Sequence, residues 1–233
     1  MTQKTAIILG ATGLTGSLLL QMLLKDNRYK KIKLFSRKTV GIKNEKLQEH
    51  LIDLLKLSDH AGNFLADEVF CCIGTTKAKT PDKDLYKKID YGIPVCAAEL
   101  CKKNKIKTFV VISALGASAE SKVFYNKLKG QMENAVVAME ISKTHILQPS
   151  LIGGFREEKR PAEWIAKNTF LILNNILVGP FRKYRSIYPQ AIASSMVWLA
   201  NNSYERLSDN GKGNEEIGRT LAHTASKYIE RLC

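Results

Sequence analysis

The chain has 233 residues, of which 45% are hydrophobic and 25% charged, so it can bury a sizeable core as one globular unit. Its longest apolar stretch, residues 170–181, is interrupted by two asparagines and is shorter than the ~20 residues that a membrane-spanning helix needs, so we expect no membrane span. The 36 basic and 22 acidic residues give a net charge of +14, but the lysines are scattered and no DNA- or RNA-reading module is recognisable, so we expect a solvated basic surface and no nucleic-acid partner.

The first elements surround a glycine-rich loop. Residues 6–9 form a short apolar run typical of a buried strand, and apolar residues recur at helical spacing from Leu18 onward. Gly10, Gly13 and Gly16 therefore lie at a strand-to-helix turn. Glycines at such a turn let the backbone approach a pyrophosphate closely, and the helix N-terminus offers N–H groups and a positive dipole. The loop predicts a dinucleotide site, with an ordinary glycine turn as the alternative.

Strand-like and helix-like segments alternate through the first 149 residues. This alternation predicts an α/β fold with a doubly wound parallel sheet, whose ligands bind beyond the carboxyl ends of the strands. We expect strands at 6–9, 32–36, 47–53, 69–73, 108–113 and 144–149, and helices that include 91–104 and 125–141. The residues at or beside the strand ends are Gly10, Ser36, Asp53, Gly74, Ser113 and Pro149.

The remainder, residues 150–233, is expected to contribute most of a small C-terminal substrate lobe. Helical patterns occur at 160–177, 188–202 and 221–232. Because no internal repeat, low-complexity tract or Pro/Ser-rich linker separates this part from the rest, we treat 1–233 as a single domain.

The end of the second strand bears on the choice of cofactor. An NAD-binding fold usually places an acid here to bind the ribose hydroxyls, but this chain has Ser36, Arg37 and Lys38. A guanidinium can bind a 2′-phosphate, whereas a carboxylate would repel it. The sequence therefore favours NADP(H) over NAD(H), with a solvent-facing loop arginine as the alternative.

Three residues form a candidate catalytic group. Tyr125 and Lys129 are four residues apart and share one face of a predicted helix, so the ammonium is expected to lower the pKa of the phenol. Ser113 ends a strand and is expected to reach the same edge of the sheet. The group predicts a proton donor, its tuning cation and an oxyanion ligand; a surface tyrosine beside a solvated lysine is the alternative.

With the glycine loop GATGLTG at 10–16, these residues resemble the short-chain dehydrogenase/reductase superfamily. The segments at 71–80, 87–92 and 156–165 (CCIGTTKAKT, KKIDYG and REEKRPAEWI) resemble an atypical branch, the Tat-interacting-protein group of NADPH-binding oxidoreductase-like proteins. The resemblance implies a Rossmann fold and a cofactor site formed by Gly10, Thr12, Gly13, Leu14 and Thr15 at the pyrophosphate, Arg37 at the 2′-phosphate, Asp53 and Leu54 at the adenine, Gly74, Thr75 and Thr76 near the ribose, and Pro149, Ser150, Leu151 and Ile152 at the nicotinamide.

The chain also departs from that pattern. Many family members have an Asn-Ala-Gly segment after the fourth strand and a catalytic asparagine in the next helix, whereas this chain has Cys72-Ile73-Gly74 and Asp90 near those positions. The family places substrate contacts after the sixth strand, which implies roles for Arg156 and Arg160; a charged loop is the alternative reading of these arginines.

The function expected from these features is an NADPH-dependent oxidoreductase that transfers a hydride between nicotinamide and a carbonyl or alcohol of a small molecule. One alternative is an NADPH-binding regulatory or redox-sensing protein without turnover, and another is an enzyme similar to the nucleotide-sugar epimerases. The segment after Pro149, which decides the substrate, contains no motif for a single ligand.

Cysteine and histidine usage bears on metals and on the compartment. The five cysteines lack CxxC spacing and the four histidines are scattered, so we expect no metal site. Cysteines within apolar segments, together with the absence of a signal-peptide pattern before the first strand, lead us to expect a cytoplasmic protein. We expect a monomer or a homodimer.

Overall fold

The computed structural model describes residues 3–150 and 187–202. Six strands form one sheet in the order β3-β2-β1-β4-β5-β6, and every neighbouring pair is parallel. This confirms the predicted doubly wound α/β fold. The elements are β1 (Lys4–Leu9), α1 (Leu14–Lys25), β2 (Tyr29–Ser36), β3 (Leu47–Leu51), the 3-10 helix η1 (Leu54–His60), β4 (Glu68–Cys71), α2 (Lys83–Lys87), the π-helical turn η2 (Lys88–Gly92), α3 (Ile93–Lys103), β5 (Thr108–Ile112), α4 (Phe124–Val137), β6 (Lys143–Leu147) and α6 (Pro189–Asn201).

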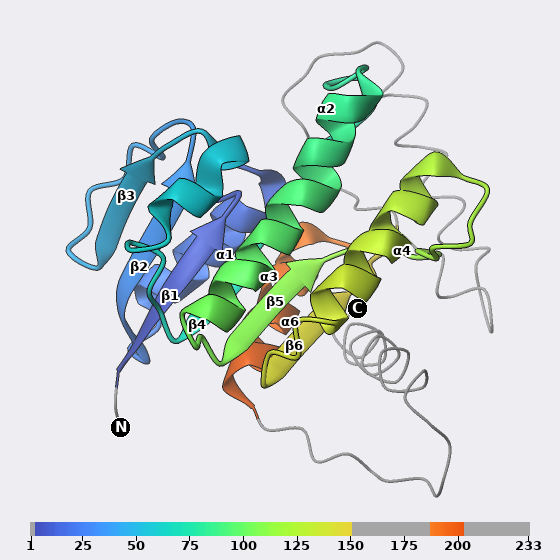
Figure 1. Ribbon diagram of the computed structural model, residues 1–233. Helices are drawn as coiled ribbons and strands as arrows, with labels where there is room; N and C mark the ends of the chain where they lie inside the picture. Colours follow the sequence, from blue (N-terminus) through green and yellow to red (C-terminus); the bar gives the residue numbers. More distant parts are fainter. Residues whose placement is uncertain (1–2, 151–186, 203–233) are drawn as a thin grey trace, which may run out of the picture.

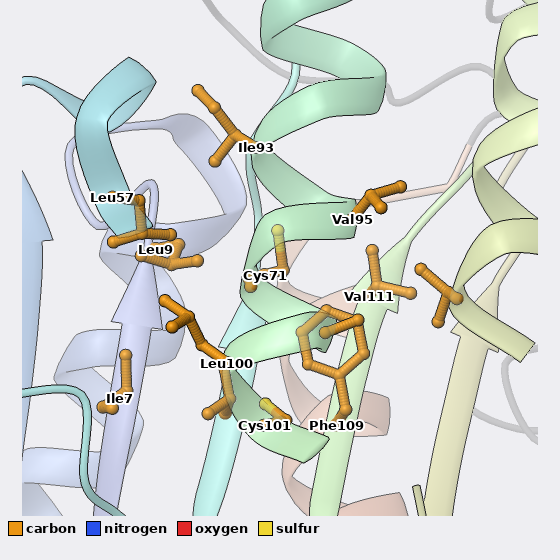
Figure 2. Close-up of a cluster of buried hydrophobic side chains, with 14 of the residues drawn as sticks. Ile7, Leu9, Leu57, Cys71, Ile93, Val95, Leu100, Cys101, Phe109 and Val111 are labelled. Carbon is orange, nitrogen blue, oxygen red and sulfur yellow. The ribbon is translucent and has the colours of Figure 1, made fainter. Parts of the chain in front are cut away.

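Helices cover both faces of the sheet (Figure 1). Alternate residues of β1 point to opposite faces, so Ile7 and Leu9 join one hydrophobic cluster while Ala6 and Ile8 join the other. The first cluster lies under η1, α3 and α4, and Figure 2 shows side chains of α3 above strands β1, β4 and β5. The second cluster lies between the sheet and helices α1 and α6. The strands are buried on both faces, as expected for a parallel sheet.

Helix α6 belongs to the layer that covers the sheet beside α1. The Tyr29 hydroxyl donates to Glu68 Oε2 over 2.6 Å, and Asn201 Nδ2 donates to the Tyr29 oxygen over 2.6 Å. Glu68 also forms an ion pair with Lys4. This buried polar network fastens the end of α6 to β1, β2 and β4 at the amino edge of the sheet, which is opposite to the glycine loop.

Several predicted boundaries differ from the observed ones. The third strand ends at Leu51 and not at residue 53, because Asp53 starts a helix: its carboxylate accepts a hydrogen bond from the Leu55 N–H at 3.0 Å. The helix predicted at 91–104 begins as α2 and η2, from Lys83 onward. The helices predicted at 160–177 and 221–232 lie outside the described residues. Among the described residues, no helix is long and apolar enough to cross a membrane.

Candidate functional site

The glycine loop connects β1 to α1 at the carboxyl edge of the sheet. Gly10 has φ +85°, and a Cβ on it would lie 2.8 Å from the Cys72 carbonyl oxygen. A Cβ on Gly16 would lie 2.1 Å from the Gly10 carbonyl oxygen. Gly10 and Gly16 therefore permit the close packing of loop, strand and helix that a dinucleotide fold requires.

Gly13 plays a different part, because a Cβ on it would meet only the Gly10 carbonyl oxygen, at 3.3 Å. It is the N-cap residue of α1, and no side chain caps the helix. Among residues 3–150 and 187–202, no side chain accepts from the first-turn N–H groups of Leu14, Thr15 and Gly16, and these groups suit an anionic ligand. Thr12 is exposed beside them.

The end of β2 provides two cations. Ser36 is buried, and its hydroxyl donates to the Lys38 carbonyl oxygen at 2.8 Å, so this side chain shapes the turn. Arg37 and Lys38 are exposed. Within the part of the chain that the structure describes, neither forms an ion pair, which leaves both available to a phosphate.

The residues that the resemblance implies for the adenine also have structural roles. Asp53 caps η1, as described above, and Leu54 is only 8% exposed within the core cluster around Leu57. Both residues stand just beyond the end of β3, which is the edge strand next to β2.

The loop after β4 is fastened to the neighbouring helical segment. The Thr75 N–H donates to Asp90 Oδ2 at 2.7 Å, and the Tyr86 hydroxyl donates to the Thr75 carbonyl oxygen at 3.2 Å. Gly74 precedes this contact, and a Cβ on it would lie at an ordinary 3.6 Å from Asp90 Oδ1. The Thr76 carbonyl oxygen accepts the N–H groups of residues 79 and 80, so the loop closes in a turn.

Lys129 and Asp90 form a buried ion pair beside this loop. Lys129 Nζ lies 3.1 Å from Asp90 Oδ1, and the two side chains are 3% and 1% exposed. Asp90 therefore holds the Thr75 backbone with one oxygen and the ammonium with the other. Asp90 belongs to the KKIDYG segment that resembles the atypical branch, and it stands near the position of the usual catalytic asparagine. The pairing could not be read from spacing, because the two residues are on separate helical segments.

Tyr125 lies in the first turn of α4 and is 36% exposed. Burial raises the pKa of its phenol to about 12, and the negative charge of Asp90 adds to the effect. The pKa of Tyr125 is therefore raised, and not lowered as its spacing from Lys129 suggested, because burial and the charge of Asp90 both disfavour the phenolate.

Ser113 follows β5 and is 3% exposed. Its Oγ makes no hydrogen bond of good geometry among the described residues, although it lies close enough to Glu133 to lower the pKa of that carboxyl. Glu133 accepts hydrogen bonds from Gln148 Nε2 at 2.9 Å to both oxygens, while burial raises its pKa above the ordinary value. Sequence reasoning missed Glu133, although it stands one helical turn beyond Lys129.

The predicted nicotinamide end is described only in part. Pro149 is buried, and its carbonyl oxygen accepts a hydrogen bond from the Leu115 N–H at 2.9 Å. Ser150 is half-buried. Leu151, Ile152, Arg156 and Arg160 lie outside the described residues.

Comparison with known proteins identifies the family. A model described as NAD(P)H-binding matches residues 10–152. The chain belongs to this NAD(P)H-binding Rossmann family, within the atypical short-chain dehydrogenase/reductases. It is 32% identical to Protein HTATIP2 of Rattus norvegicus over 174 residues, which cover 73% of this chain and 72% of that protein. It is 30% identical to Protein FMP52-1, mitochondrial, of Scheffersomyces stipitis over 217 residues, which cover 87% and 90% of the two chains.

Solved structures support the same fold. UDP-N-acetylglucosamine 4-epimerase from Methanobrevibacter ruminantium M1 superposes with a TM-score of 0.65 and 18% sequence identity, covering 88% of this chain and 75% of the epimerase. At this identity the similarity shows the fold and not the reaction.

The expectation of a cytoplasmic protein is contradicted by the relatives. The FMP52 proteins of Scheffersomyces stipitis, Debaryomyces hansenii and Meyerozyma guilliermondii are all named mitochondrial. The cysteine pattern misled because it reports a reducing environment for thiols and carries no information on the organelle.

Proposed function

We propose that this protein is an NADP(H)-dependent oxidoreductase that reduces a carbonyl group of a small molecule, or oxidises the corresponding alcohol. The observation that supports the proposal is that Ser113, Tyr125 and the Asp90–Lys129 pair all follow β4 or β5 in the chain. Strand β4 is next to β1 and its glycine loop, and β5 is next to β4. In a parallel sheet these strand ends meet at one edge, where ligands bind.

Each residue has a separate part in the proposed reaction. A bound nicotinamide supplies or accepts the hydride. Reduction of a carbonyl leaves negative charge on its oxygen, which the Ser113 hydroxyl stabilises as a hydrogen-bond donor. Tyr125 then donates its phenolic proton to that oxygen. Lys129, held by Asp90, supports the loop that carries Thr75.

The test of turnover is NADPH oxidation with a panel of aldehydes and ketones. Tyr125→Phe should lose turnover by at least about a hundredfold, the range of a general acid, while NADPH affinity remains. Tyr188→Phe is the matched control, because Tyr188 is 64% exposed at the start of α6. Wild-type turnover in Tyr125→Phe would remove Tyr125 from the chemistry.

The proposed preference for NADP(H) depends on Arg37 and Lys38. Arg37→Ala removes one charge-assisted contact, which should weaken NADPH binding by about 1.5–3 kcal/mol and leave NADH binding unchanged. Lys30→Ala removes an exposed cation near the opposite end of β2 and serves as the control. Equal affinities of the wild-type protein for NADPH and NADH would contradict the preference.

One observation favours a second candidate, an NADPH-binding regulator without turnover. Asp90 forms an ion pair with Lys129, the lysine that was expected to activate Tyr125. The pKa of Tyr125 is raised to about 12. If cofactor binds but no carbonyl compound is reduced or alcohol oxidised, this candidate replaces the enzyme. An epimerase is a third candidate, and its only support is the shared fold.

A further inference from the structure

The loop after β2 is held from the edge strand by a carboxylate that the catalytic proposal does not use. Glu49 lies on β3, opposite Leu34 of β2. Its Oε2 accepts a hydrogen bond from Thr39 Oγ1 at 2.7 Å, and its Oε1 accepts one from the Val40 N–H at 2.8 Å. One side chain therefore binds two successive residues of the loop that carries Arg37 and Lys38.

The same loop is fixed at three further points. The Ser36 hydroxyl donates to the Lys38 carbonyl oxygen at 2.8 Å. The Gly41 N–H donates to Thr39 Oγ1 at 3.0 Å, and Gly41 has φ +69°, which glycine adopts without strain. The Val40 side chain packs against the cluster under α1. Arg37 and Lys38 are thus carried by a short turn with fixed ends, while their own side chains are exposed.

The way in which Glu49 is engaged matters as much as its position. Neutral donors occupy both of its oxygens, and no ion pair joins it to a cation within the described ranges. The loop that Glu49 binds carries Arg37 and Lys38, and neither cation forms an ion pair with it. Because Glu49 binds the loop backbone and a hydroxyl, it leaves the two cations without a carboxylate partner among the described residues.

We propose that Glu49 is a positioning residue for cofactor selection: it holds the turn after β2 so that Arg37 and Lys38 are preorganised for the 2′-phosphate that distinguishes NADPH from NADH. The inference rests on the proposed preference for NADP(H). A loop that is already held in its binding conformation loses less conformational entropy when the ligand binds, so the ligand binds more tightly. NADH lacks the 2′-phosphate and gains nothing from the turn, so Glu49 affects the affinity for only one of the two cofactors.

A positioning role and a simple charge role predict opposite results. The negative charge of Glu49 repels a phosphate, so if charge decided the outcome, its removal would strengthen NADPH binding. If positioning decides, loss of the two hydrogen bonds weakens NADPH binding. Glu49→Gln separates the two roles, because its carbonyl oxygen can accept from the Val40 N–H and its amide can donate to Thr39 Oγ1 without any charge.

The experiment measures dissociation constants of NADPH and NADH for the full chain by calorimetry. Glu49→Ala should raise the dissociation constant of NADPH about tenfold, because the loop must then be ordered when NADPH binds. The dissociation constant of NADH should change less than twofold. Glu49→Gln should stay within about threefold of the wild type for NADPH. Thr39→Val, which removes one of the two hydrogen bonds to Glu49, should weaken NADPH binding by less than Glu49→Ala does and leave NADH binding unchanged. It replaces Glu49→Ala in the test if that variant does not fold.

Glu45→Ala is the matched control, because Glu45 is an exposed carboxylate of the same loop. It should leave both constants unchanged. Equal losses for NADPH and NADH in Glu49→Ala, unchanged constants, or tighter NADPH binding would each overturn the inference. A wild-type preference that survives in Glu49→Ala removes the inference alone, whereas a wild-type protein without any preference removes the proposed NADP(H) selectivity and this inference with it.

Discussion

Asp90→Asn should destabilise the protein strongly through the buried ion pair. Asparagine can still accept the hydrogen bond from the Thr75 N–H, so the change isolates the contact with Lys129, whose Nζ lies 3.1 Å from Asp90 Oδ1. Side-chain exposures of 1% and 3% leave no solvent to screen an unpaired ammonium. Removing one partner of such a pair costs about 3–5 kcal/mol, which is a large part of the about 5–15 kcal/mol by which domains are stable.

The assay is thermal and urea unfolding of the single and double variants. At about 2–4 °C per kcal/mol for a chain of this size, Asp90→Asn should lower Tm by roughly 6–20 °C. The double variant with Lys129→Met and Asp90→Asn has no unpaired buried charge. Its loss in free energy of unfolding should therefore be smaller, by at least about 2 kcal/mol, than the sum of the losses in the two single variants.

The control is a pair on the surface. Lys102 Nζ lies 3.8 Å from Glu140 Oε2, with side-chain exposures of 55% and 84%, so Glu140→Gln should change stability by less than about 0.5 kcal/mol. An Asp90→Asn protein within about 1 kcal/mol of the wild type would refute the reasoning. In that case the ammonium of Lys129 reaches solvent or another partner.

Three further outcomes are expected. Gly16→Ala should cost about 1–3 kcal/mol and reduce NADPH affinity, since its Cβ would lie 2.1 Å from the Gly10 carbonyl oxygen; Gly62→Ala, with open space around it, is the control. His145 is buried, and burial lowers its pKa to about 4, so the unfolded chain binds more protons than the folded one when the pH is below the ordinary value of 6.5. The free energy of unfolding therefore decreases as the pH is lowered from about 6.5 toward 4. Urea titrations should show that lowering the pH from 7 to about 5 destabilises His145→Leu by about 2 kcal/mol less than it destabilises the wild type. Tyr125 should remain a phenol at pH 10, because its pKa is raised to about 12, so the wild-type and Tyr125→Phe proteins should show equal tyrosinate absorbance there.

The fold could be predicted because its signals are local and repeat. Apolar strands such as residues 6–9 and 108–112 alternate with helical segments, and the rules for parallel crossovers leave only a handful of arrangements of such units. The ends of strands were less predictable where a side chain forms a hydrogen bond that replaces the hydrogen bonds between paired strands. Asp53 ends the third strand by capping a helix, and the apolar pattern of residues 47–53 contains no sign of this.

The site was predictable only as a set of parts. The glycine loop and the spacing of Tyr125 and Lys129 are local patterns, whereas the partner of Lys129 comes from η2, beyond β4. The same holds for Glu49, whose two hydrogen bonds cross from β3 to the preceding loop. Contacts between separate elements depend on register and side-chain direction, which one sequence does not reveal.

The charges around Tyr125 bear on the direction of the proposed reaction. The negative charge of Asp90 adds to burial in raising the pKa of Tyr125, and Asp90 also forms the ion pair with the ammonium of Lys129. A local field that is neutral or negative keeps the phenol protonated, which is the form that reduction consumes. Oxidation of an alcohol needs the phenolate instead, and the positive charge of an oxidised nicotinamide would favour that form. The arrangement therefore suits an acid in the reductive direction, and a carbonyl compound is the better first choice of substrate than an alcohol.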